Sequence, residues 1–173
     1  FMVLQRLSDA LCSDQELLGV VVGHASCADA HHLVAPSPDG AGPLRCMRLA
    51  LGDAEITASE VSHVNAHGTS TLLNDASEAA AVSALFGGTS PPVTAVKGST
   101  GHMIGGSGAV EAIVTLSSLR RGVVPPVAGL RTVDPTIEVD VVRAEPRPVP
   151  PGYGLSNSFG FGGVDTSLVL AAP

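Results

Sequence analysis

Apolar residues occur in short runs along the chain, separated by polar, glycine-rich or proline-rich stretches. Short runs rich in β-branched residues predict strands, and longer segments with apolar residues three or four apart predict helices. The predicted strands are residues 1–4, 17–23, 61–65, 93–96, 153–156 and 166–170. The predicted helices are residues 43–51, 75–85 and 109–119. Strands that alternate with helices favour a layered α/β fold.

Local signals add detail to three of these elements. Three successive valines at residues 20–22 predict a strand that is buried on both faces, as in a covered sheet. Thr57 and Glu60 have the spacing of a capping box, in which each side chain binds the backbone of the other residue. Asn74 or Asp75 is the predicted N-cap of the alanine-rich helix at residues 75–85.

The composition is that of one folded domain. The chain has 173 residues, of which 45% are hydrophobic and 14% are charged, so it can bury a core and is not disordered. Its formal net charge of −7 disfavours a nucleic-acid partner, because the neutralisation of phosphates requires clustered lysine and arginine. No apolar run approaches the roughly 18 residues that a membrane-spanning helix needs.

The cysteines and the first residues bear on the cellular setting. Cys12, Cys27 and Cys46 show neither paired nor metal-binding spacing. We therefore expect no metal site, no disulfide framework and a reducing, cytoplasmic location. The predicted strand at residues 1–4 begins with the first residue, which suggests that the chain is a piece of a longer protein.

Polar side chains and glycines follow three of the predicted strands, where ligands bind in open α/β sheets. Residues 64–71 contain His67 and two threonines, and residues 97–108 contain Lys97 and His102 among glycines. The second loop lacks the residue order of a phosphate-binding loop, which disfavours a mononucleotide site. Each loop also has a structural alternative, in which the histidine is a lone loop residue and the lysine pairs with a nearby carboxylate.

The third loop has an unusual composition. Residues 157–163 place Phe159 and Phe161 among glycines between two predicted strands. Glycines allow a ligand to approach the backbone closely, and the N–H groups that they expose can stabilise an oxyanion. The alternative is a tight turn between strands with Phe159 packed in the core.

Four motifs follow one another along the chain: His67-Gly-Thr-Ser-Thr, Asn74-Asp75-x-x-Glu78, Lys97-x-x-x-Gly101-His102 and Asn157-Ser-Phe-Gly-Phe-Gly-Gly. In order and spacing they resemble the β-ketoacyl-acyl carrier protein synthases, or ketosynthases, the condensing enzymes of fatty acid and polyketide synthesis. The resemblance covers essentially the whole chain and implies a thiolase-like fold in αβαβα layers. It implies that residues 1–173 are the C-terminal half-domain and that the half with the nucleophilic cysteine is absent.

The resemblance also implies roles for individual residues. His67 and His102 match the two catalytic histidines of the family, whose N–H groups stabilise the enolate of the malonyl unit. Lys97 matches a lysine of the catalytic site that contacts a carboxylate on the helix after the first loop, here Asp75 or Glu78. None of the three cysteines matches the nucleophile.

Further matches concern the walls of the site. Phe161 matches the gatekeeper ring of the catalytic site, and its backbone N–H matches a donor to the oxyanion of the acyl group. Thr69 and Thr71 match threonines that bind the phosphopantetheine arm of the acyl carrier protein. The residues expected to support the site are Asp75, Glu78, Asn157, Gly160 and Gly162.

The implied function is decarboxylative Claisen condensation of an acyl thioester with malonyl-acyl carrier protein to give 3-oxoacyl-acyl carrier protein. The expected partners are the acyl carrier protein, the N-terminal ketosynthase half, and a second subunit in a homodimer or in a heterodimer with a chain length factor. No cofactor is expected, because the phosphopantetheine arm arrives with the carrier protein. The alternatives are a non-catalytic scaffold of the chain-length-factor type and a degradative thiolase, which the lack of a cysteine in residues 157–163 disfavours.

Overall fold

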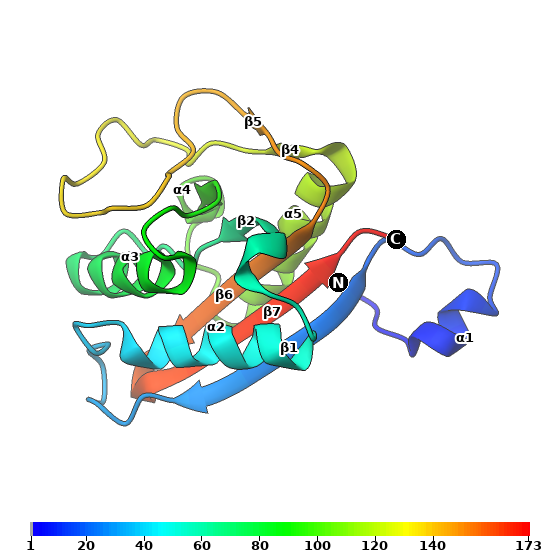
Figure 1. Ribbon diagram of the computed structural model, residues 1–173, viewed down its shortest axis with the longest axis horizontal. Helices are drawn as coiled ribbons and strands as arrows, with labels where there is room; N and C mark the ends of the chain where they lie inside the picture. Colours follow the sequence, from blue (N-terminus) through cyan, green and yellow to red (C-terminus); the bar gives the residue numbers. More distant parts are fainter. Residues whose placement is uncertain (1) are drawn as a thin grey trace.

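A five-stranded mixed sheet lies at the centre of the molecule (Figure 1), in a computed structural model that describes residues 2–173. The strand order is β1-β7-β6-β2-β3. These strands are β1 (Val20–Ala28), β2 (Val61–Asn65), β3 (Val93–Thr94), β6 (Tyr153–Gly160) and β7 (Val164–Ala171). The pairs β1–β7 and β7–β6 are antiparallel, whereas β6, β2 and β3 are parallel. A separate antiparallel ribbon joins β4 (Val123–Val124) and β5 (Arg147–Pro148).

Helices cover both faces of this sheet. The α-helices are α1 (Leu7–Leu11), α2 (Ala41–Asp53), α3 (Leu72–Phe86), α4 (Lys97–Thr100) and α5 (Ser107–Arg121), and the short 3-10 helices are η1 (Ala58–Glu60), η2 (Ile104–Gly106) and η3 (Phe161–Gly163). On one face of β6, Asn157 donates a hydrogen bond to Met47 of α2. On the other face, a Cβ at Gly154 would meet Thr115 of α5. Because successive strand residues point to opposite faces, α2 and α5 lie on opposite sides of the sheet, as Figure 1 shows.

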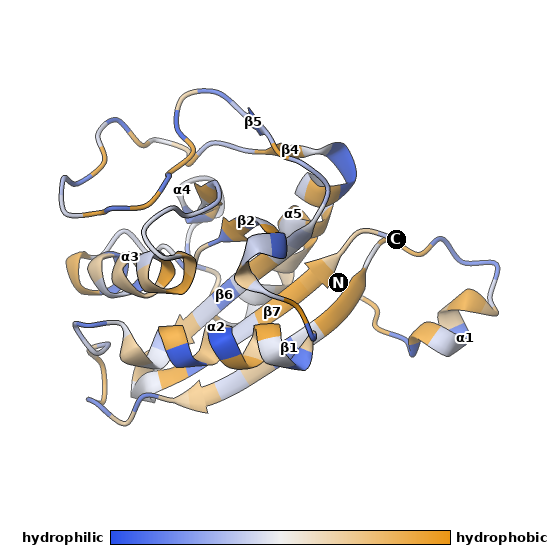
Figure 2. Cartoon of the chain, in the orientation of Figure 1, coloured by the Kyte–Doolittle hydropathy of each residue, from blue (hydrophilic) through white to orange (hydrophobic). Residues whose placement is uncertain are grey.

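The main hydrophobic core lies between the sheet and the layer formed by α2 and α3. Met47, Val64, Val82, Leu155 and Val169 each expose at most 1% of their surface, and burial of a side chain of this size stabilises the fold by about 1.5–3 kcal/mol. Figure 2 shows apolar residues along the strands and alternating polar and apolar residues along α2. No helix within residues 2–173 has the length and apolar character needed to cross a membrane.

Several predicted elements are confirmed, and with them the α/β class. β2 occupies residues 61–65, and both hydrogen bonds of the capping box between Thr57 and Glu60 form at η1. α3 ends at a glycine in the left-handed region, Gly87 with φ 66°, and α5 ends at Gly122 in the same way. Glycine commonly ends helices because it enters this region without a steric penalty.

Three predictions for the N-terminal part were wrong. Residues 2–4 form no strand and their side chains are exposed, while Phe1 lies outside the described residues. The strand predicted at residues 17–23 begins at Val20 and continues to Ala28, because it pairs with β7 over that length. It is not buried on both faces, because several of its residues are exposed, including Val21 at 44%.

Other elements also differ from the prediction. α3 begins at Leu72 with Thr71 as its N-cap, so neither Asn74 nor Asp75 caps it. The glycine-rich stretch after β3 contains α4 and η2, and is therefore not a continuous loop. β6 continues to Gly160, because its antiparallel pairing with β7 extends to the turn. The first half of the third predicted loop therefore belongs to a strand.

The carboxyl ends of β2, β3 and β6 lie at one edge of the sheet, because these strands are neighbours and run parallel. Residues 66–71 follow β2, α4 follows β3, and η3 follows β6. The three segments with candidate functional residues therefore meet at this edge, which is where open α/β sheets bind ligands.

Candidate functional site

His67 and His102 meet at the edge of the sheet where the three parallel strands end. His67 follows β2, and His102 lies between α4 and η2. Their ring centroids are 5.5 Å apart, and the ring planes form an angle of 81°. The ring of Phe159, near the end of β6, lies 6.0 Å from that of His67. The structure thus brings together the two histidines that were predicted to act together.

Lys97 determines which nitrogen of His67 carries the proton. The ammonium group of Lys97 donates to the backbone carbonyl of His67, to a carboxylate oxygen of Glu111, and to Nδ1 of His67, from which it lies 3.2 Å away. An ammonium group can only donate hydrogen bonds, so Nδ1 must accept. The ring proton of His67 is therefore on Nε2.

His102 has the same tautomer for a different reason. The backbone N–H of Ile104 donates to Nδ1 of His102 at 3.1 Å, and the hydroxyl of Ser107 lies 3.3 Å from the same nitrogen. Ile104 has φ 52°, a left-handed conformation that β-branched residues rarely adopt and that costs about 1–3 kcal/mol. This conformation directs the N–H of Ile104 toward Nδ1 of His102. Because Nδ1 accepts that hydrogen bond, Nε2 of His102 carries the proton in the neutral form.

The environment of His67 keeps its ring neutral. Burial lowers the pKa of His67 to about 3, and the neighbouring charges of Lys97 and His102 act in the same direction. The side chain is only 6% exposed, whereas His102 is on the exposed side of the site. At pH 7, His67 therefore acts as a neutral hydrogen-bond donor through Nε2.

Glu78 holds the backbone of the loop that carries His67. Its carboxylate accepts hydrogen bonds from the N–H of His67 at 2.9 Å, from the N–H of Gly68 at 3.0 Å and from Nδ2 of Asn157 at 3.2 Å. Burial raises the pKa of Glu78, and these donors partly offset the effect. Asp75 adds one contact from the same helix, since it accepts the N–H of Ser70 at 3.2 Å.

The predicted partner of Lys97 was wrong. Lys97 forms its ion pair with Glu111 of α5, and not with Asp75 or Glu78 of α3. The two carboxylates of α3 instead bind the backbone of the histidine loop. Both members of the Lys97–Glu111 pair are almost completely buried, so removal of either charge would leave the other without a partner in the protein interior.

The remaining predicted residues line the outer part of this edge. The hydroxyls of Thr69 and Thr71 lie 2.8 Å apart; Thr69 is half-buried and Thr71 is exposed. Phe161 is 82% exposed at the turn that follows β6. In this turn Gly162 has φ 80°, which favours glycine, whereas a Cβ at Gly160 would meet only an ordinary contact 3.6 Å away. The roles of these residues stay predictions.

The sequence-based predictions missed Glu111 and Ile104 and gave Phe159 no role beside the histidines. Glu111 is a single charge within an otherwise apolar stretch of α5, and this isolation was the signal that could have revealed it. Phe159 was considered, but only as part of the core or of a turn. The contact between Ile104 and His102 depends on a left-handed backbone conformation, for which an isoleucine gives no sequence signal.

The cysteines occupy other environments. Cys46 is completely buried in the core, its thiol points to the carbonyl of Ala25, and burial raises the pKa of Cys46 to about 12. Cys27 lies in the edge strand β1, and Cys12 is exposed after α1. Within residues 2–173, no group of three or more histidine, cysteine, aspartate or glutamate side chains has the arrangement of a metal site.

Comparison with known proteins places this arrangement in a family. Residues 18–131 match the family described as "Beta-ketoacyl synthase, C-terminal domain". Over 171 residues the chain is 39% identical to a 3-oxoacyl-[acyl-carrier-protein] synthase 2 from Synechocystis sp.. That alignment covers 98% of this chain and 41% of the relative, so the chain spans about two fifths of the length of the curated protein that it matches.

Two solved structures share the fold. The structure named "The ishigamide ketosynthase/chain length factor" is 34% identical with a TM-score of 0.90, and the match covers 96% of this chain and 41% of that one. A type II polyketide synthase acyl-carrier protein in complex with its ketosynthase bound to the hexaketide gives 28% identity and a TM-score of 0.91, with the same coverage. The predicted thiolase-like fold is confirmed by these ketosynthases. The match over residues 18–131, together with this similarity along almost the whole chain, shows that the protein belongs to the β-ketoacyl synthase C-terminal domain family.

Proposed function

We propose that this domain supplies the decarboxylating, enolate-stabilising part of a β-ketoacyl synthase, which condenses an acyl thioester with malonyl-acyl carrier protein to give 3-oxoacyl-acyl carrier protein. The observation that carries the proposal is the contact between the rings of His67 and His102. Nδ1 of His67 accepts a hydrogen bond from Lys97, and Nδ1 of His102 accepts one from the backbone N–H of Ile104. Each ring therefore offers an Nε2–H donor at the edge of the sheet.

The proposed reaction requires two such donors. When the malonyl unit loses CO2, the electron pair of the broken C–C bond moves into the thioester, and negative charge develops on the thioester oxygen of the resulting enolate. N–H groups aimed at that oxygen stabilise the enolate more than the neutral thioester, so they accelerate decarboxylation. The enolate carbon then attacks the acyl thioester, and the thiolate of the acylated cysteine leaves.

The neutral state of His67 supports this role. With a pKa of about 3 the ring is uncharged at pH 7, and the contact with Lys97 keeps the proton on the nitrogen that faces away from that lysine. Lys97 and Glu111 act as positioning residues in this proposal, because they set the tautomer of His67 without touching the substrate. Glu78 acts similarly on the backbone of the loop.

The acyl group is carried, in this proposal, by a cysteine of the N-terminal ketosynthase half. Cys46 is unsuited to the role because burial raises the pKa of its thiol to about 12, and a thiolate is the reactive form. The backbone N–H of Phe161 stabilises the oxyanion that forms on the acyl carbonyl. The exposed ring of Phe161 controls access, and Thr69 and Thr71 bind the phosphopantetheine arm through their hydroxyls.

The proposed partners are the acyl carrier protein and a second ketosynthase-type subunit. Similar proteins support both, because one solved relative is an acyl-carrier protein complex and another is named a ketosynthase/chain length factor. The reaction needs no cofactor beyond the phosphopantetheine arm of the carrier protein. Three free cysteines are compatible with a reducing cytoplasm, which is the location that we propose.

The competing function is a non-catalytic subunit of the chain-length-factor type. The presence of His67, His102 and the buried Lys97–Glu111 pair favours the catalytic subunit, because a scaffold needs no preorganised pair of donors. The complete enzyme, with its cysteine acylated beforehand, is incubated with malonyl-acyl carrier protein. It should form 3-oxoacyl-acyl carrier protein, which is detected by its intact mass. If a protein with an intact cysteine forms none of this product, and condensation is restored when a second ketosynthase subunit is added, the chain is a non-catalytic scaffold.

A further inference from the structure

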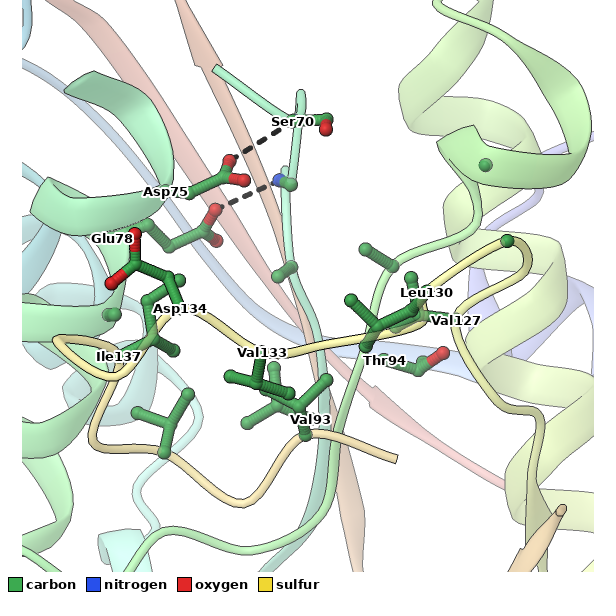
Figure 3. A pocket seen from close by; sticks show the side chains of 18 of the residues that line it. Ser70, Asp75, Glu78, Val93, Thr94, Val127, Leu130, Val133, Asp134 and Ile137 are labelled. Atoms are coloured by element: carbon green, nitrogen blue, oxygen red, sulfur yellow. Dashed lines mark hydrogen bonds between the residues drawn. The ribbon is translucent and has the colours of Figure 1, made fainter. Parts of the chain in front are cut away.

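A cavity of about 570 Å³ lies beside the histidine loop, between α3, β3 and a strap formed by residues 127–141. Figure 3 shows the strap crossing the opening, with Val133 beside Val93 of the sheet and Ile137 toward α3. The volume lies within the roughly 300–1,000 Å³ typical of sites for small molecules. Nothing in the proposed condensation uses this space.

The walls of the cavity favour an aliphatic ligand. The apolar side chains that face it include Val82, Val93, Leu130, Val133, Ile137 and Val139. None of its lining residues, all in the described part of the chain, is aromatic. Aliphatic walls without rings suit a flexible hydrocarbon chain, whereas planar ligands are usually held by aromatic side chains. At roughly 30 Å³ for each water-sized group, the volume of about 570 Å³ corresponds to about 19 such groups, which is more than a chain of ten carbons needs.

One cationic group lines the cavity. Among its carboxylates, Glu78 accepts the backbone of the histidine loop, Asp75 accepts the N–H of Ser70, and Asp134 accepts both donors of Thr136. Arg131 is exposed, and within residues 2–173 its side chain forms no hydrogen bond or ion pair. A guanidinium group binds a carboxylate through two parallel hydrogen bonds. The cavity therefore combines aliphatic walls with one available site for an anionic head group.

The strap is fixed at its ends and weakly held between them. The N–H of Val127 donates to the carbonyl of Val142 at 2.9 Å, and Val93 exchanges hydrogen bonds with Asp140 and Val142 at 2.8 Å. Between these anchors, the described hydrogen bonds of the strap are local ones, such as that from Ile137 to Asp134 at 2.9 Å. A segment anchored only at its ends can adjust to a ligand without the loss of a sheet ladder.

The cavity shares its wall with the functional loops. Gly68, Ser70 and Glu78 line it from the histidine loop and the helix that holds it. On the other side, a Cβ at Gly98 would lie 2.3 Å from the carbonyl of Ala128, so the strap packs directly against the helix that carries Lys97. A ligand in the cavity would therefore contact Gly68, Ser70 and Glu78, which belong to the loop of His67 or hold it in place.

We propose that this cavity is a binding site for a medium-chain aliphatic carboxylate, with its chain between α3 and the strap and its carboxylate on Arg131. The site is separate from the pair of histidines and does not depend on the proposed condensation activity. Its occupancy would stiffen the strap and the adjoining histidine loop.

Isothermal titration with decanoate tests the proposal on the purified protein. We expect saturable binding of one decanoate per chain, with a dissociation constant on the order of 1 mM or lower. Arg131→Gln should weaken decanoate binding at least threefold and leave 1-decanol binding unchanged. Arg121→Gln, at an exposed position outside the cavity, is the matched control and should bind both probes as the wild type does.

A second pair of variants tests the location of the chain. Val133→Trp fills the cavity and should weaken both decanoate and 1-decanol at least tenfold, whereas Val123→Trp, outside the cavity, should bind normally. No binding of decanoate to the wild type would overturn the proposal. Equal binding by Val133→Trp and Val123→Trp would show that the aliphatic chain does not lie in this cavity. Equal effects of Arg131→Gln and Arg121→Gln would show that Arg131 does not bind the carboxylate.

Discussion

The ammonium nitrogen of Lys97 lies 3.2 Å from Nδ1 of His67 and also pairs with the buried carboxylate of Glu111. One buried cation thus fixes the tautomer of one histidine, while a backbone N–H fixes that of its neighbour His102. Both rings present the same kind of donor by unrelated means. The chemistry proposed for this domain depends on that agreement.

The tautomer of His67 can be observed directly. Burial lowers the pKa of His67 to about 3, so nitrogen NMR should show a neutral ring with its proton on Nε2 from pH 8 to pH 5. Lys97→Ala removes the donor to Nδ1 and should produce a mixture of the two tautomers. A charged His67 ring at pH 6, or a single unchanged tautomer in Lys97→Ala, would contradict this interpretation.

Glu111→Gln should destabilise the protein strongly. The substitution leaves the ammonium group of Lys97 buried without a counter-charge, which typically costs about 3–5 kcal/mol. The free energy of unfolding, measured with urea, gives the effect. Glu138→Gln is the matched control, because Glu138 is exposed, and its free energy of unfolding should stay within about 0.5 kcal/mol of the wild type. Similar free energies of unfolding for the two variants would show that the Lys97–Glu111 ion pair does not stabilise the fold.

Glu78→Gln should affect both stability and activity. A glutamine has one acceptor oxygen, so it cannot receive all three donors that reach Glu78, and its own N–H2 group would face the N–H of His67 or Gly68. We expect a loss of roughly 2 kcal/mol or more in the free energy of unfolding and a decrease of at least tenfold in condensation. Asp75→Asn removes the charge behind a single loop hydrogen bond and should cost less on both measures. The reverse order would show that Glu78 does not hold the loop.

Asp165 should make the stability depend on pH. Burial, with a further contribution from Asp29, raises the pKa of Asp165 to about 6 from 3.8, against an opposing contribution from Arg45. Because the folded state binds this proton more tightly, stability from this group is present below pH 4 and is lost as pH rises through about 6. Asp165→Asn should therefore be more stable than the wild type by about 3 kcal/mol at pH 8, and the difference should shrink toward pH 4. Chemical unfolding at both pH values checks this, and a constant difference would contradict the assigned pKa.

The resemblance to the β-ketoacyl-acyl carrier protein synthases predicted that His67 and His102 act together. The structure brings the two rings together because their loops follow strands whose ends share one edge of the sheet. The sequence also predicted the ends of α3 and α5 to within two residues, and each helix is followed by a glycine in the left-handed region. The partner of Lys97 could not be predicted, because α3 and α5 both carry carboxylates and only the packing of α4 decides which one is near. The valines at residues 20–22 suggested a strand covered on both faces, but β1 has exposed residues, Val21 among them. Which elements cover the two faces of a strand is not encoded in the local pattern.

Release of CO2 from malonyl-acyl carrier protein by the complete enzyme tests the proposed roles of His67 and His102 most directly. His67→Ala and His102→Ala should each abolish decarboxylation, because each removes one of the two donors to the enolate oxygen, while acyl transfer to the cysteine partly persists. His24→Ala, on the exposed edge strand, should release CO2 at the wild-type rate. Decarboxylation at the wild-type rate in His67→Ala or His102→Ala would show that the two histidines do not stabilise the enolate together.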